Sequence, residues 1–227
     1  SRDWSSDVCS SDLSGVKTLL KIILSDRKFS DSLETPSSSG KMFIELKTED
    51  VKNEFKSSFR ISTYKYDKHD WQDINQCVDP KLMDVIVKSV CCFANGKGGN
   101  LIIGKRDNGE IFGIEPDMES LPSKHTGEKS TDKFELTIVN HLNSKIRNSE
   151  HLVSEIKISY ETESESKKQI CILKIPPSKK PIFTNDGKFY VRTGTECREL
   201  NSEQSNSYIS SRDRKSTRLN SSHVKRS

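Results

Sequence analysis

The chain has 227 residues, of which 31% are hydrophobic and 31% charged, and its formal net charge is +4 at pH 7. No apolar run approaches the roughly 20 residues that a membrane-spanning helix needs, which predicts a soluble protein with no membrane partner. The six cysteines show no C-x-x-C spacing, which argues against a disulfide framework and a zinc ribbon and favours the reducing cytoplasm.

The two ends of the chain account for most of its net charge. Residues 1–13 (SRDWSSDVCSSDL) and 212–227 (RDRKSTRLNSSHVKRS) resemble translated sequencing-adapter sequence, and we interpret both as adapter-derived. Residues 1–12 have a net charge of −2 and residues 212–227 one of +5, which leaves +1 for residues 13–211. The total charge is therefore no argument for nucleic-acid binding, because a basic footprint must be local to one surface.

One domain is predicted between these ends. Residues 14–40 are interpreted as a linker or a fragment of a preceding region, since residues 25–40 are rich in serine. Residues 41–211 then form a single domain of ordinary size with a core of its own. Additional sequence at both ends is compatible with a longer natural protein whose other domains are missing here.

The domain is predicted to begin with a strand and a loop. Residues 52–61 (KNEFKSSFRI) are predicted to form a strand, because the apolar residues Phe55, Phe59 and Ile61 recur at short intervals. The polar segment of residues 62–77 predicts a loop in which Trp71 anchors the packing.

A helix and a hairpin follow. Asp79 and Pro80 supply an N-cap and a first-turn proline, and apolar residues then recur at spacings of three or four as far as Asn95-Gly96. Unbroken apolar residues predict a buried strand over residues 100–104. The Asp-Asn-Gly turn at residues 107–109 predicts a hairpin with EIFGI.

The second half predicts one helix, two further hairpins and a final helix. The helix is predicted at 131–146, because Phe134, Ile138, Leu142 and Ile146 lie on one apolar stripe. The hairpins pair residues 153–160 with 169–175 and residues 181–184 with 188–194, and the final helix covers residues 201–210. The predicted fold class is therefore α+β. It is a single lobe with a mixed, mostly antiparallel sheet that is built from hairpins and packed by two to three helices.

The glycine-rich loop Asn95, Gly96, Lys97, Gly98 and Gly99 has two interpretations. As a nucleotide-binding loop it lacks the order of a P-loop, because here the helix precedes the glycines and presents its negative end to them. As a structural corner it needs no ligand, since Asn95 and Gly96 stand where a left-handed helix cap belongs. The corner is the favoured interpretation, and ATP is not an expected cofactor.

Several blocks of the sequence resemble one family. They are NEFKSSFR, SVCCFANGKGGNLIIGKRDNGEIFGIE, DKFELTIVNHL and PIFTNDGKFYVRTGTECREL, within residues 45–210. Their order and spacing resemble the Schlafen-type AlbA-like domain in its bacterial form. The resemblance implies an α+β fold and a nucleic-acid-binding module, once described as a divergent ATP-binding domain.

The resemblance also implies a three-carboxylate site, as in the animal Schlafens that cut transfer and ribosomal RNA. The matching residues are Glu49, Glu54 and Asp107, which would hold Mg²⁺ or Mn²⁺ for in-line attack on a phosphate. Lys56 would project from the same face of a strand as Glu54 and bind a phosphate oxygen. Without the resemblance, these charges would be read as ordinary surface and turn residues.

A second set of residues would bind the nucleic-acid backbone. Where this family usually has Val-Asp-Asp before the turn, this chain has Lys105-Arg106-Asp107, and the two cations could either compete for the carboxylates or contact phosphates. The full set of expected contacts is Lys105, Arg106, Lys179, Lys180 and Arg192. Cys91 and Cys92 are predicted to be small buried apolar residues instead, and His141 and His151 surface or helix-end residues.

Three functions remain open at this point. The favoured one is an RNA- or DNA-binding module of a regulator or defence protein. The alternatives are a metal-dependent endoribonuclease that cuts structured RNA and an ATP-binding regulatory module. Because animal relatives form a cleft from two similar lobes, a homodimer would be the simplest way for this single lobe to form a comparable groove.

Overall fold

The computed structural model describes residues 42–122 and 130–223, with side chains as far as Arg212. The segments predicted as adapter sequence at 1–13 and as linker at 14–40 lie outside the described residues. The helices are α2 (Met42–Glu45), α3 (Thr63–Asp67), η1 (Ile74–Cys77), α4 (Pro80–Asn95), α5 (Glu115–Glu119), α6 (Thr131–Lys145), α7 (Glu150–Glu155) and α8 (Ser202–His223). The strands are β1 (Asn53–Lys56), β2 (Gly99–Ile103), β3 (Lys157–Thr162), β4 (Gln169–Ile175), β5 (Phe189–Thr193) and β6 (Glu196–Leu200).

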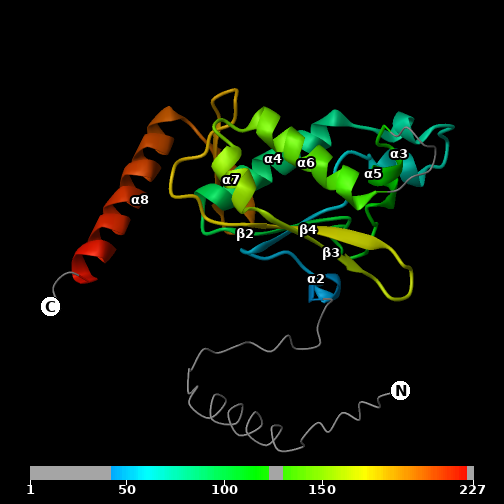
Figure 1. The fold of residues 1–227 in the computed structure, drawn as a ribbon, viewed down its shortest axis with the longest axis horizontal. Coiled ribbons are helices and arrows are strands. Elements are labelled where there is room, and N and C mark those ends of the chain that lie inside the picture. The colour runs from blue at the N-terminus through cyan, green and yellow to red at the C-terminus, as the bar shows by residue number, and fades with distance from the viewer. Residues whose placement is uncertain (1–41, 123–129, 224–227) are drawn as a thin grey trace, which may run out of the picture. The chain divides into compact units, whose positions relative to one another are not determined.

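The main sheet has four strands in the order β1-β2-β4-β3. β1 and β2 are parallel, whereas β2–β4 and β4–β3 are antiparallel. Helices α4, α6 and α7 cover one face of this sheet and the short α2 lies against the other (Figure 1). β5 and β6 form a separate antiparallel pair. The predicted α+β class with a mixed sheet is thus confirmed.

The sheet is not built from successive hairpins, which corrects part of the prediction. The chain passes from β1 through α4 to the parallel β2, as parallel pairing requires a long crossover. Because β2 is already flanked by β1 and β4, residues 110–114 add no strand to it. They make only a single bridge between Lys105 and Ile111.

Helix α4 forms where the sequence predicts it. The Asp79 carboxylate accepts a hydrogen bond from the Lys81 N–H at 3.0 Å, and Pro80 occupies the first turn. The helix ends with the Gly96 N–H bound to two carbonyls, but Gly96 has a φ of −95°. The left-handed residue is instead Gly98, with a φ of 73°.

Two apolar clusters fill the two faces of the sheet. The larger one lies beneath α4 and α6. Phe134, Ile138 and Leu142 of α6 are buried in it, as predicted for the apolar stripe of that helix. The smaller one lies between the sheet and α2 and includes Phe55 and Ile102. Successive side chains of a strand face opposite sides, which assigns every β-residue to one of these two faces.

Other elements differ from the prediction in extent. The expected strand of residues 52–61 is limited to β1, and α3 and η1 form within the predicted loop. Trp71 does anchor that loop, since its ring stacks on Tyr66 at 5.3 Å. The segment 181–184 makes one bridge to β5, which pairs with β6 instead. No described helix has the length and apolar character needed to cross a bilayer.

The cysteines also depart from the prediction. Cys92 of α4 forms a disulfide with Cys197 of β6, 105 residues later, with a Cα–Cα distance of 5.8 Å. Spacing motifs such as C-x-x-C detect only cysteines that are close in sequence, so this pair left no sequence signal. Cys77, Cys91 and Cys171 are free and buried, as expected for small apolar side chains.

A buried carboxylate explains why β1 ends early. Asp117 of α5 is fully buried and accepts hydrogen bonds from the Ser58 hydroxyl and from the N–H groups of Phe59, Arg60 and Ile61. The N–H groups of residues 59–61 are therefore bound to a side chain rather than to a neighbouring strand of the sheet, and Ile61 makes only an isolated bridge to Val78. This contact turns the chain away from the sheet towards α3.

We expect Asp117→Asn to lower the free energy of unfolding by about 3 kcal/mol, because an amide replaces one acceptor oxygen with a donor and loses the charge. Urea denaturation of both proteins measures the change. Asp70→Asn, which alters an exposed aspartate, is the matched control and should lie within about 0.5 kcal/mol of the wild type. Equal losses in the two variants would contradict this account of the turn.

Candidate functional site

Three of the predicted site residues come together beside β1. The Glu49 carboxylate accepts a hydrogen bond from the Phe55 N–H at 2.6 Å. Lys56 Nζ lies 3.0 Å from Glu54 Oε1 and 4.0 Å from Glu49 Oε1. Lys56 and Glu54 therefore share one face of the strand, as their spacing predicts, and Lys56 links the two carboxylates.

Glu54 is enclosed by further partners. Its side chain is 8% exposed, and its Oε1 accepts a hydrogen bond from the Ser89 hydroxyl of α4 at 2.9 Å. Its Oε2 is paired with Nη1 of Arg192 from β5. Burial works against ionisation of Glu54, but Lys56, Ser89 and Arg192 together outweigh it and lower the pKa of the carboxyl.

Arg192 has a structural position rather than the predicted surface one. Its side chain is 5% exposed, and its Nε and Nη2 donate to the carbonyls of Val51 and Asp50 at 3.0 and 2.9 Å. Its guanidinium carbon lies 4.5 Å from the centre of the Phe93 ring. These contacts occupy the donors that would otherwise bind a phosphate.

The geometry does not fit a metal ion. Asp107, the third expected ligand, lies exposed in the turn after β2. Among the side chains that the structure describes, no three of the His, Cys, Asp and Glu type gather closely enough to hold a cation. The Glu54 oxygens already bind Lys56, Ser89 and Arg192, and two cations beside a carboxylate oppose a third positive charge.

The two basic residues after β2 are also engaged within the protein. Lys105 is fully buried, and its Nζ donates to the carbonyls of Phe43 and Ile44 of α2, both at 2.7 Å. Burial lowers the pKa of Lys105 to about 8. Arg106 binds both carboxylate oxygens of Asp67, at 3.0 and 2.8 Å. The expectation that Lys105 contacts nucleic acid does not fit its burial.

The glycine-rich loop has the close packing of a structural corner. The Asn95 side chain is fully buried and hydrogen-bonds the backbones of Ile182 and Tyr190. A Cβ at Gly99 would stand 2.3 Å from the Phe93 ring, and one at Gly98 would stand 2.6 Å from the Ile175 carbonyl. The glycines are thus required by neighbouring protein atoms.

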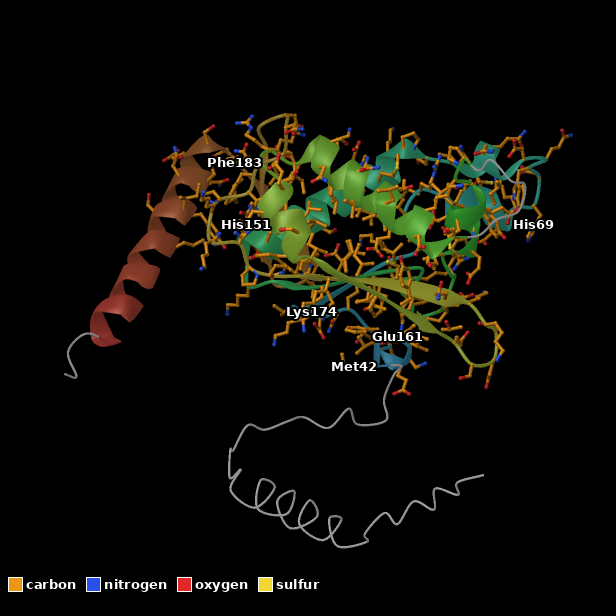
Figure 2. The ribbon with its side chains drawn as sticks, in the orientation of Figure 1. Met42, His69, His151, Glu161, Lys174 and Phe183 are labelled. Carbon is orange, nitrogen blue, oxygen red and sulfur yellow. A yellow bond between two sulfur atoms is a disulfide. The ribbon has the colours of Figure 1, made fainter. Side chains whose placement is uncertain are left out.

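A groove on the α2 side of the sheet is lined by several lysines, none of which was predicted from the sequence to bind nucleic acid. We call it the lysine groove and define it by its exposed Lys52, Lys97, Lys157 and Lys174. Its volume is about 880 Å³, and Met42 and Phe43 of α2 line it. Among the described residues, Glu155 is the one acidic residue in its lining. In Figure 2, Lys174 projects from the sheet on the side where Met42 lies.

Strand register explains why these lysines meet. Asn53 pairs with Asn100, Asn100 with Lys174, and Lys174 with Lys157, which makes one row across all four strands. The β1 member of the row, Asn53, precedes Phe55 by two residues, so the row faces the same side of the sheet as the smaller apolar cluster. The row lies next to that cluster, nearer the start of β1. The only sequence signal was an outward-facing lysine in each of β3 and β4.

Lys179 and Lys180 lie apart from Arg192, in a neighbouring pocket of about 710 Å³ that follows Pro176 and Pro177. The structure therefore divides the predicted phosphate-binding residues. Lys105, Arg106 and Arg192 have partners within the protein, whereas Lys179 and Lys180 are exposed.

Comparison with known proteins places the chain in a family. Residues 49–201 match the family model described as Schlafen, AlbA_2. The chain belongs to the Schlafen AlbA_2 family. This match contains β1 to β6, the carboxylate cluster and the four lysines of the lysine groove, whereas α2 precedes it.

No curated protein matches this Schlafen AlbA_2 chain. Among solved structures, it is similar to the DIP2311 protein from Corynebacterium diphtheriae, with 16% sequence identity and a TM-score of 0.41. That match covers 65% of this chain and 24% of the other, so the chain spans about a quarter of that protein's length.

We expect Glu54→Gln to lower the free energy of unfolding at pH 7 by about 3 kcal/mol, because the enclosed Arg192 loses its counter-charge. The folded-state pKa of Glu54 is below its unfolded value, so its contribution is present above about pH 4.3 and is lost as pH falls further. The difference in the free energy of unfolding between variant and wild type should therefore become smaller as the pH falls below about 4.3. Chemical denaturation between pH 3 and 7, with the exposed Glu110→Gln as control, measures it. A gap that is independent of pH would refute this role of Glu54.

Lys105→Met tests the buried lysine. The folded-state pKa of Lys105, about 8, is below the unfolded value of about 10.4, so the unfolded chain binds more protons between these values. The stability of the wild type relative to Lys105→Met should consequently rise as pH increases from about 8 to 10. Thermal denaturation at stepped pH measures this difference, and a constant or falling difference would contradict it.

Proposed function

We propose that this domain binds nucleic acid, RNA or DNA, through the lysine groove, as a module of a regulator or defence protein. The observation that carries the proposal is the row in which Lys174 and Lys157 stand side by side on the sheet, flanked by Lys52 and Lys97. A concave surface with clustered cations is the electrostatic footprint that a phosphate backbone requires.

The charges of the groove are available to a ligand. None of its four lysines forms an ion pair with a described residue, whereas Lys56, Arg106 and Arg192 all do. The low net charge of residues 13–211 does not oppose this proposal, because the cations are concentrated on one surface. Neutralised phosphates release counterions, which makes such binding fall with added salt.

The endoribonuclease hypothesis has less support. Glu49 and Glu54 do lie within reach of one lysine, but Asp107 stands outside that cluster and Glu54 is held by two cations. Metal-dependent cleavage would require Lys56 and Arg192 to leave Glu54. The nucleotide-binding hypothesis lacks an open cradle, since the Asn95–Gly99 loop is packed against protein atoms.

Salt-dependent binding tests the proposal. We expect the logarithm of the binding constant for a labelled RNA or DNA to fall linearly with the logarithm of salt concentration. Lys174→Ala and Lys157→Ala should each weaken binding and reduce the slope by about 0.7–0.9, the value for one lost phosphate contact. Fluorescence anisotropy at stepped KCl concentrations measures both quantities.

Lys81→Ala is the matched control, because Lys81 is equally exposed but belongs to the first turn of α4 on the other side of the sheet. It should leave affinity and slope unchanged. Equal effects of all three variants would assign the binding to net charge rather than to the groove, and an absence of binding to both nucleic acids at low salt would overturn the proposal.

A further inference from the structure

A second hollow adjoins the lysine groove. We call it the proline pocket, lined by Pro176, Pro177, Pro181, Phe183, His151 and Arg147, with Lys179 and Lys180 beside them. It lies between α7 and the segment that follows β4, and its volume is about 710 Å³. Its lining does not include Glu49, Glu54, Lys56 or Arg192, so it is separate from the carboxylate cluster.

The pocket combines an apolar wall with a cationic rim. Buried Leu152 and Ile182 and the ring of Phe183 form the wall, and the prolines add flat apolar surface. Arg147, Lys179 and Lys180 supply positive charge, opposed by Glu150 and Glu155. The imidazole of His151 is 83% exposed, so its ring can contact a ligand.

The wall is held in place before any ligand arrives. The Phe183 ring packs on Phe189 with a centroid distance of 4.9 Å, and its carbonyl accepts the Arg147 N–H at 2.9 Å. The Ser178 hydroxyl donates to the Lys180 carbonyl at 2.8 Å. A pocket with its shape fixed in this way needs little reorganisation to bind a rigid planar group.

The pocket and the lysine groove share part of their lining. Both are lined by Glu155, Pro176 and Pro177, so the two prolines form the ridge between them. Figure 2 shows Lys174 on the α2 side of the sheet and His151 and Phe183 on the helix side, at the end of the domain away from His69. A polymer whose backbone lies along the lysines would cross this ridge directly into the pocket.

We propose that the proline pocket receives one unpaired nucleobase of the nucleic acid bound in the lysine groove, an inference that rests on the proposed function. A base offers flat apolar faces to Phe183, His151 and the prolines, and its adjoining phosphates meet the rim cations. A base within a duplex is stacked on both faces and cannot enter. The domain therefore selects nucleic acid that carries a single-stranded end or bulge beside its bound segment.

Paired probes test this selection. A short labelled duplex with blunt ends is compared with the same duplex carrying a single-stranded overhang that contains 2-aminopurine, each as RNA and as DNA. We expect wild type to bind the overhang probe about tenfold more tightly, the size of one base–aromatic stacking contact. The 2-aminopurine fluorescence should fall on binding, as it does when that base stacks.

Two variants report on the pocket without removing the groove. His151→Asn changes an exposed side chain, and Phe183→Leu keeps apolar volume but removes the aromatic face. Both should abolish the advantage of the overhang probe while leaving affinity for the blunt probe unchanged. His69→Asn, a change of the same type at an exposed histidine outside the pocket, should retain the advantage.

Equal affinity of wild type for the two probes, or an advantage that survives both pocket variants, would overturn the inference and leave the proposed function intact. A failure of every probe to bind at low salt would overturn the proposed function, and the inference with it.

Discussion

The contact between Glu54 and Arg192 joins parts of the chain that are 138 residues apart. It fastens β5, and with it the β5–β6 pair, to the first strand of the main sheet. Ser89 of α4 donates to the same carboxylate, so one side chain connects a helix and both sheets. Ion pairs that are this enclosed add little net stability over an apolar packing, but they are costly to break and specify which elements meet.

That contact also decides what the carboxylates can do. A carboxylate that is open to solvent can bind a cation or activate water, whereas Glu54 is neutralised by Lys56 and Arg192 and bound by Ser89. Membership of the Schlafen AlbA_2 family therefore does not by itself carry the three-carboxylate chemistry to this chain. In this fold Glu49 and Glu54 have a structural explanation, since Glu49 binds the β1 backbone and Glu54 binds Lys56 and Arg192.

The two faces of the sheet consequently have different roles. The face beneath α4 and α6 carries the main core and the ion pairs of Glu54 with Lys56 and Arg192. The other face is covered only in part by α2. Lys105 and Glu161 bind the backbone of α2 at Phe43 and Ile44 and keep it at that place. The uncovered part of this face is where the lysine row and its groove remain accessible.

The sequence by itself determined the elements whose signal is local: α4 from its cap and apolar period, α6 from its stripe, the β3–β4 hairpin from its strands, and the family from several blocks. Only the tertiary structure decided that β1 lies parallel to β2, that Lys105 is buried, that Cys92 meets Cys197 and that Lys157 stands beside Lys174. The period of a strand shows which of its residues share a face, but not which strand lies next to it or in what register. Sites made from several strands, such as the lysine groove, depend on that register, and the register is set by the packing of the whole domain.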